Sequence, residues 1–222
     1  MEPLRVAFFL DGFTLKKVNE YYRMHHRFHS NLDFRGLRVW VQQQSLKFFE
    51  NGGYRDLELE SHYYHPFKNP HICKQEGMIR LECELESAGY QVHFNHSVHK
   101  DGELGPNMSL MEDALLFAMY RKLDAVVLFS TQGQFAMLPG RLRQMGIPTL
   151  VLGWELDYPK AQRIIHWKTD EYLREDCAHY VAMEKVVDQS PNSTEGPRGF
   201  FFQSEHPFSH HHLRGTSRKN KN

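Results

Sequence analysis

The chain has 222 residues, and its content of 41% hydrophobic and 13% aromatic residues is enough for one domain with a buried core. Its 27 Lys and Arg balance its 27 Asp and Glu, which excludes a partner held by overall charge alone but allows a local basic groove. The three cysteines lack metal-ligand spacing and argue against a disulfide framework or a Cys-rich zinc site.

The N-terminal segment runs directly into a short apolar stretch that ends at Asp11. This stretch is too short to cross a membrane, and it lacks the basic start and the cleavage site of a signal peptide. We therefore expect a cytoplasmic protein without a membrane partner.

Apolar strands alternate with helices along most of the chain. We expect strands at residues 6–10, 57–64, 90–95, 124–129 and 149–152. We expect helices at residues 14–29, 34–50, 74–88, 135–145 and 169–187, and another that opens at Ser109 with capping-box spacing to Glu112. Several strands are apolar on both faces, which is typical of a parallel sheet covered on both sides. The pattern predicts an α/β fold with a mainly parallel central sheet flanked by helices.

The composition changes near residue 188, where Ser, Pro, Gly, Asn and His become frequent. We therefore expect a folded domain at residues 1–187 and a disordered tail at residues 188–222. The end of the tail carries Arg214, Arg218, Lys219 and Lys221 without an acid. These cations are compatible with a weak nucleic-acid arm and also with an ordinary solvated tail.

Polar residues follow the expected strands at the edge where an open parallel sheet binds its ligands. Asp11 ends the first strand, and the turn from Ser130 to Gln134 follows the strand at residues 124–129. Asn107 lies in the loop before the helix that opens at Ser109, and Asp113 lies in that helix. The order of the strands predicts that these side chains share one edge of the sheet.

These pieces, taken in order over residues 4–175, resemble the NYN family of PIN-like nucleases, especially its LabA-like branch. The resemblance lies in Asp11-Gly-Phe after the first strand, in Asp113, in Ser130 with a small-residue turn, and in the closing segment Thr169–Leu173. It implies a three-layer, Rossmann-like (PIN-like) fold and a metal-dependent cut of RNA. Mg²⁺ or Mn²⁺ would polarise the phosphate and would be held by clustered carboxylates.

Most of the family's acidic positions carry other residues in this chain. Asp11 and Asp113 remain as candidate catalytic and metal-binding residues, but Asn107 stands at the position of the loop acid. Gln132 and Gln134 stand at the positions of the two turn acids. Amides offer a neutral oxygen and cannot act as a general base, so we expect weak or absent metal binding and no resident cofactor.

Each retained residue also has a structural interpretation. Asp11 can be a turn residue, and Asp113 can complement the dipole of its helix. Asp170 is expected to cap its own helix. Asp101 or Glu103 could supply one missing charge if the loop at residues 96–107 folds back toward the site.

Candidate nucleic-acid contacts come from the first helix and from the turn. We assign this role to Lys16, Lys17, Arg23, Ser130 and Thr131. Aromatic residues at the end of the second strand are also candidates for base stacking, although a covered aromatic cluster explains them equally well: Tyr63, Tyr64 and Phe67. A metal site formed by His62, His65 and His71 has weaker support.

Three functions agree with these residues. The leading hypothesis is a degenerate domain that binds RNA, with nuclease activity lost or residual. The alternatives are an active ribonuclease that uses Mg²⁺ or Mn²⁺ and a scaffold for a protein partner.

Overall fold

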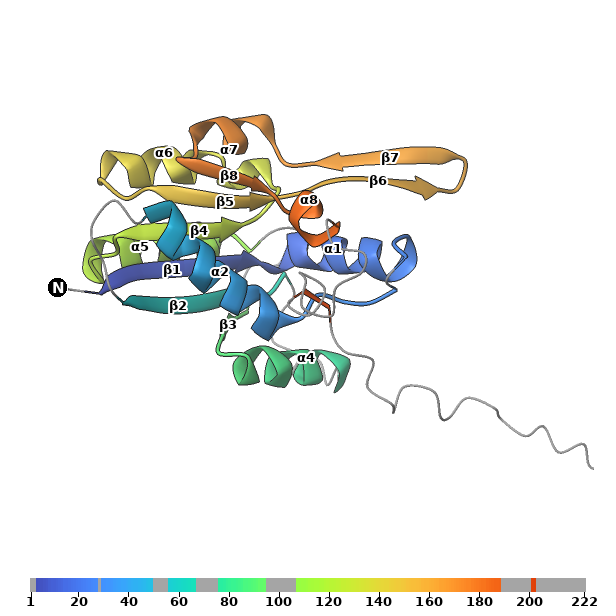
Figure 1. Ribbon diagram of the computed structural model, residues 1–222, viewed down its shortest axis with the longest axis horizontal. Coiled ribbons are helices and arrows are strands. Elements are labelled where there is room, and N and C mark those ends of the chain that lie inside the picture. Colours follow the sequence, from blue (N-terminus) through green and yellow to red (C-terminus); the bar gives the residue numbers. More distant parts are fainter. Residues whose placement is uncertain are drawn as a thin grey trace, which may run out of the picture.

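The computed structural model describes residues 3–27, 29–49, 56–66, 76–94, 107–188 and 201–202. Within these ranges, six strands form one sheet with the spatial order β3-β2-β1-β4-β5-β8 (Figure 1). The strands are β1 (Leu4–Asp11), β2 (Leu57–Tyr64), β3 (Gln91–His93), β4 (Ala125–Phe129), β5 (Thr149–Gly153) and β8 (His179–Ala182). All neighbouring pairs in this sheet are parallel, which confirms the predicted α/β fold.

Helices cover both faces of the sheet and make three layers. One face carries α1 (Gly12–Met24), α2 (Phe34–Phe49), α4 (Glu76–Ser87) and α8 (Met183–Asp188). The other face carries α5 (Ser109–Tyr120), α6 (Met137–Gln144) and the short α7 (Glu171–Asp176). The side chains of β1 alternate between two buried clusters, so that Phe8 packs under α1 and α2 while Phe9 packs under α5. The predicted Rossmann-like layering is therefore confirmed.

Strand β1 lies at the centre of the sheet, paired with β2 on one side and β4 on the other. The strand order reverses here, because the chain fills the β2 side first and then crosses to β4. Such a switch point leaves a crevice at the carboxyl ends of the two strands, where open α/β sheets bind ligands. In this chain those ends are Asp11 and Ser130.

A two-stranded antiparallel hairpin, β6 (Glu155–Lys160) and β7 (Arg163–Lys168), leaves the carboxyl edge of the sheet beside α1 (Figure 1). The sequence pattern did not predict it. The continuous helix predicted at residues 169–187 is wrong as well, since α7, β8 and α8 occupy that stretch. Cys177 adopts an extended backbone with φ −77° and ψ 156°, and the Ala178 N–H bonds to the Thr149 carbonyl at 3.0 Å. The chain thus pairs with the free edge of β5 and forms β8, the sixth strand of the sheet.

The predicted tail, residues 188–222, is described only at Asp188, Phe201 and Phe202. Asp188 ends α8, and the other two residues are buried in the same cluster as α1 and α2. Phe201 packs on Trp40 with ring centroids 5.7 Å apart, and the Asp33 N–H donates to its carbonyl at 2.8 Å. Two residues beyond 188 therefore belong to the core, and the proposed domain boundary stays a prediction.

Two further findings concern the cysteines and membranes. Cys83 and Cys177 are free thiols, and Cys73 lies outside the described residues. In the ranges that the structure describes, the helices are too short or too polar to cross a membrane.

Candidate functional site

Asp11 sits at the switch point and caps helix α1. Its Oδ1 accepts the Phe13 N–H at 3.0 Å, and its Oδ2 accepts the Thr14 N–H at 3.4 Å. The Thr14 and Ser130 hydroxyls also donate to Oδ2, at 2.7 Å and 2.9 Å. The carboxylate therefore joins the end of β1, the first turn of α1 and the end of β4.

The Asp11 side chain has no exposed surface. Burial raises its pKa above the ordinary value, and the hydrogen bonds from Thr14 and Ser130 act in the opposite direction. Three of the four donors point to Oδ2 and one to Oδ1. Because the carboxylate is also fully buried, it is not accessible to an ion in this arrangement.

Asp113 belongs to a different hydrogen-bond network, on the β2–β3 side of the sheet. Its Oδ2 accepts the Tyr64 hydroxyl at 2.8 Å, and the His93 Nδ1 lies 3.8 Å away. The Asp113 side chain is 29% exposed. Tyr64 and His93 stack with ring centroids 4.5 Å apart, which fixes both partners of the carboxylate. Asp113 is thus the more accessible of the two retained acids.

Asn107 is buried, and its amide nitrogen has a structural role. Its Nδ2 donates to the carbonyl of His65 at 3.2 Å and to that of His93 at 3.5 Å. Its Oδ1 accepts the Ser109 N–H at 3.2 Å. The predicted capping box at Ser109 is therefore wrong, because Asn107 supplies the side-chain acceptor at the start of α5. An ionised Asp could accept from Ser109 but could not donate to the two carbonyls.

The turn after β4 is closed by its own side chains. The Thr131 N–H donates to the Thr14 hydroxyl at 3.1 Å, and the Gln132 Nε2 donates to the Thr131 hydroxyl at 3.0 Å. Gln134 is exposed. Ser130 and Thr131, which we expected to contact nucleic acid, are buried and use their hydroxyls internally. These hydroxyls hold the turn, whose exposed part is Gly133 and Gln134, with Gln132 partly exposed.

Asp170 lies directly against this turn, a proximity that the sequence did not predict. As expected it caps α7, with its Oδ1 accepting the Tyr172 and Leu173 N–H groups at 3.0 and 3.3 Å. A Cβ added at Gly133 would come within 2.6 Å of the Asp170 Oδ2, so only glycine fits there without a shift. The carboxylate of Asp170 thus stands beside the turn that carries Gln132 and Gln134.

A pocket of about 390 Å³ opens between the β4 turn, the base of the hairpin and α7. It is lined by Gln132 and Gly133, by Trp167 and Lys168 from β7, and by the exposed Tyr172. The Lys168 ammonium pairs with Glu171 at 2.6 Å. Polar groups and two aromatic rings therefore line an open pocket at the carboxyl edge, next to the switch point.

The described acids do not converge on one point. Among residues 3–27, 29–49, 56–66, 76–94, 107–188 and 201–202, no group of three His, Cys, Asp or Glu side chains is placed to hold a metal ion. A hard divalent ion requires several oxygen ligands at one place. The described donor set does not fit the Mg²⁺ or Mn²⁺ that the family resemblance implies. Asp101 and Glu103, the alternative acids, lie outside the described residues.

The histidine cluster suggested by the sequence is also rearranged. His62 and His65 are buried, and His71 lies outside the described residues. The His62 Nδ1 is 3.2 Å from the His93 Nε2, and the His62 Nε2 is 3.5 Å from Glu60. Burial, followed by the nearby His93, lowers the pKa of His62 to about 4. His62 is therefore a neutral core residue at physiological pH.

The predicted cations of α1 lie on two faces of that helix. Lys16 and Arg23 are seven residues apart and share an exposed face with Glu20. Lys17 lies on another face with Tyr21 and His25, and its ammonium is 6.0 Å from the Phe13 ring. Tyr63 and Tyr64 are buried, so the interpretation as a covered aromatic cluster is correct for them, and Phe67 lies outside the described residues.

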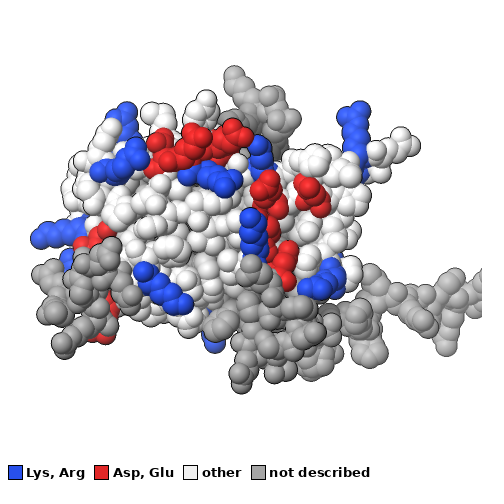
Figure 2. All heavy atoms as spheres, turned by 45° about the horizontal axis from the view of Figure 1, so that its top comes forward, with Lys and Arg blue, Asp and Glu red and all other residues white. Residues whose placement is uncertain are grey.

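Surface charge is mixed on the face of the molecule that Figure 2 shows. Figure 2 shows Asp and Glu interleaved with Lys and Arg rather than one broad surface of a single sign.

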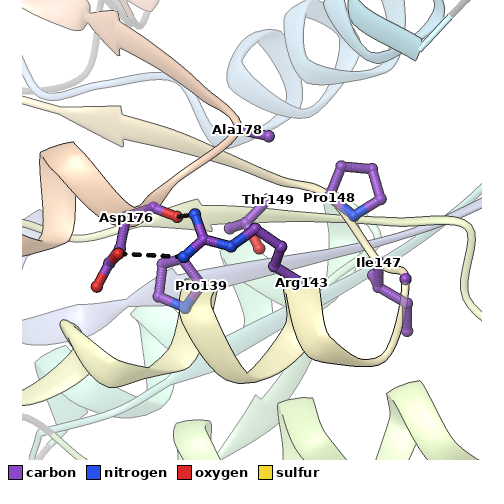
Figure 3. A pocket seen from close by; sticks show the side chains of 8 residues that line it. Pro139, Arg143, Ile147, Pro148, Thr149, Asp176 and Ala178 are labelled. Carbon is purple, nitrogen blue, oxygen red and sulfur yellow. Dashed lines mark hydrogen bonds and ion pairs between the residues drawn. The ribbon is translucent and has the colours of Figure 1, made fainter.

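A second pocket, of about 230 Å³, lies at the opposite edge of the sheet, beside the start of β5 (Figure 3). There Arg143 pairs with Asp176 at 3.4 Å over Pro139 and Thr149 (Figure 3). That pocket is remote from the switch point.

Comparisons with known proteins agree with this architecture. The model of the NYN domain family matches residues 5–184, and NYN domains belong to the PIN-like nuclease superfamily. Among solved structures, a protein of unknown function from Vibrio parahaemolyticus is similar, with a TM-score of 0.55 and 18% identity. The similarity covers 82% of this chain and 96% of that one, and at this identity it supports the fold alone. No curated protein matches the chain.

Proposed function

The chain belongs to the NYN domain family, and from this premise we propose that it is a pseudonuclease that binds single-stranded RNA at the carboxyl edge of its sheet. Membership of the family points to a nuclease-like or RNA-related role. The remaining question is whether the site binds and cuts, or only binds.

The observation that carries the proposal is the closed environment of Asp11. Its carboxylate is fully buried and accepts four hydrogen bonds from Phe13, Thr14 and Ser130. Recruiting it to an ion would break the cap of α1 and leave buried hydroxyl donors without acceptors, at about 1–3 kcal/mol for each unsatisfied group. The Asn107 amide is committed to two carbonyls in the same way. These residues support an interface more readily than a metal centre.

Binding of RNA is supported by what the same edge exposes. The pocket beside the β4 turn presents amide groups and the exposed ring of Tyr172, on which a base can stack. Lys16, Lys17 and Arg23 extend from α1, which starts at the same edge, and can pair with phosphates. The neutral Gln132 and Gln134 would not repel the RNA backbone as the family's turn acids would.

The test uses the full chain with a fluorescein-labelled single-stranded RNA. We expect the fluorescence anisotropy to report binding at low salt, with the same affinity in EDTA as in Mn²⁺. We expect the RNA to remain intact on a denaturing gel after incubation with Mn²⁺. Asp113→Asn is the informative variant for cleavage, because an Asn oxygen can still accept from Tyr64 and the fold should survive.

Two results would overturn the proposal. Absence of RNA affinity at low salt would remove its binding part. Cleavage that EDTA stops and that Asp113→Asn abolishes would instead establish a metal-dependent ribonuclease, completed by an acid outside the described residues.

A further inference from the structure

The β6–β7 hairpin carries an arrangement of charge that the stability of the fold does not explain. One face of the ribbon holds the cross-strand pairs Leu156–Trp167, Tyr158–Ile165 and Lys160–Arg163. The first pair packs on the core, and the second lies against α1. The third pair places two cations directly opposite one another, an arrangement that destabilises a ribbon.

The other face of the same ribbon shows the opposite arrangement. Its first pairs from the base are Glu155–Lys168 and Asp157–His166, each with one acidic and one basic side chain. The Asp157 carboxylate and His166 are 2.7 Å apart. The tip also has Ala161 at φ 55°, a left-handed conformation that is unfavourable for a residue with a Cβ. A two-residue turn between the paired Lys160 and Arg163 accounts for the positive φ of Ala161, but not for the like charges beside it, which require a reason.

Aromatic contacts hold the ribbon against α1 and aim its tip. Tyr158 stacks on His25 with ring centroids 4.9 Å apart, and it lies 6.1 Å from the Tyr21 ring. Tyr21 and His25 share their helix face with Lys17, four residues before Tyr21. The ribbon continues past the end of α1 (Figure 1). Lys160 and Arg163 lie on the ribbon face that α1 covers nearer the base, but beyond the end of that helix. Both cations are exposed, and neither forms an ion pair with a described carboxylate.

We propose that the hairpin and α1 form one RNA-binding arm, in which Lys160 and Arg163 hold phosphates of a single strand that leaves the carboxyl-edge pocket. Phosphate between the two cations replaces their repulsion by attraction. The exposed His25 offers an imidazole ring beside this path for a base. The ribbon runs outward from the pocket, because Trp167 and Lys168 line the pocket and Arg163 begins the same strand. This inference rests on the proposed function, and it adds the path that the RNA strand follows beyond the pocket.

The arm is tested by salt-dependent binding of a labelled oligouridylate. Each phosphate contact to single-stranded RNA contributes roughly 0.7 to the slope of log affinity against log salt. The double variant Lys160→Ala with Arg163→Ala should therefore lower the slope by about 1.4 and weaken binding on the order of tenfold at low salt. The matched control is Lys122→Ala with Arg141→Ala, which removes the same charge from exposed positions away from the hairpin and should leave the slope unchanged.

A charge reversal separates binding from folding. Lys160→Glu creates an attractive pair with Arg163, so it should keep or raise the melting temperature while it weakens RNA binding. A lower melting temperature would mean that Lys160 serves the fold, and the arm would be refuted. Wild-type affinity and slope in the double variant, or equal losses in the control, would refute it as well while leaving RNA binding by the domain intact. A wild-type chain without RNA affinity would overturn both the proposed function and the arm.

Discussion

Replacing Asp11 by Ala tests whether this carboxylate is a structural cap or a site residue. The change removes the side-chain cap of α1, which is worth about 1 kcal/mol. It also removes the acceptor of the buried Ser130 hydroxyl, and a buried donor without a partner costs about 1–3 kcal/mol. The Thr14 hydroxyl can turn to the Thr131 hydroxyl, 3.2 Å away, so it adds little.

The two losses together give about 2–4 kcal/mol of free energy of unfolding. Part of this loss in free energy of unfolding is offset, because the alanine variant no longer buries a carboxylate. The cost of that burial appears as the raised pKa of Asp11. We therefore expect a loss near the lower end, about 2 kcal/mol, which corresponds to a melting temperature lower by roughly 4–8 °C in a domain of this size.

Urea unfolding followed by tryptophan fluorescence measures this loss, with Asp113→Ala as the matched control. Asp113 is partly exposed and accepts one hydrogen bond, from Tyr64, so its removal should cost only about 1 kcal/mol. An Asp11→Ala protein as stable as the wild type, or more stable, would refute the structural reasoning. Stabilisation is the signature of a residue kept for function at the expense of the fold.

Three further predictions concern the surroundings of the site. Asn107→Asp should lower the free energy of unfolding by about 1–3 kcal/mol in thermal or urea melts, because a carboxylate would face two backbone carbonyls, and calorimetry should detect no gain in Mn²⁺ affinity. Gly133→Ala should destabilise the chain, since the new methyl would meet the Asp170 carboxylate at 2.6 Å, and Asp170→Ala should cancel much of that effect in a double-mutant cycle. His62 has a folded pKa of about 4 against an ordinary 6.5, so the unfolded state takes up its proton first and stability should fall by roughly 3 kcal/mol as pH drops from 6.5 to 4. His62→Phe should flatten this part of the pH profile, and an unchanged slope in that variant would contradict the assignment.

The sheet could be predicted from sequence because its strands are apolar on both faces. Strands such as Leu4–Asp11 and Ala125–Phe129 are long apolar runs bounded by turn residues, and only a doubly covered parallel sheet buries both of their faces. The region at residues 155–187 was mispredicted for the opposite reason. The strands β6 and β7 are short, half exposed and rich in charge, and the four-residue β8 is a strand because it pairs with the free edge of β5. The alternation of Ile165 and Trp167 with polar residues was the available signal for the hairpin.

The candidate site was predictable in position but not in chemistry. The switch-point rule placed Asp11 and Ser130 at the carboxyl edge, where they lie. It could not show that the two side chains bond to one another, because their contact spans 119 residues of sequence. The proximity of Asp170 to Gly133 depends on the same long-range packing. Sequence spacing therefore located the edge, and the assignment of donors and acceptors required the folded chain.

The hydrogen bonds at this edge bear on the predicted loss of its acids. From the sequence, we predicted that Asn107 stands at the position of an acidic ligand. In the fold it is a donor to two strand-end carbonyls, a role that no ionised carboxylate can fill. Asp11 kept its charge, yet its oxygens serve the cap of α1 and the Ser130 hydroxyl. These contacts support the proposal that the site has lost its metal chemistry, and they give Asn107 a structural role of its own. Restoring acids at Asn107, Gln132 and Gln134 would add charge without freeing the Asp11 oxygens, so the present packing would still oppose a metal centre.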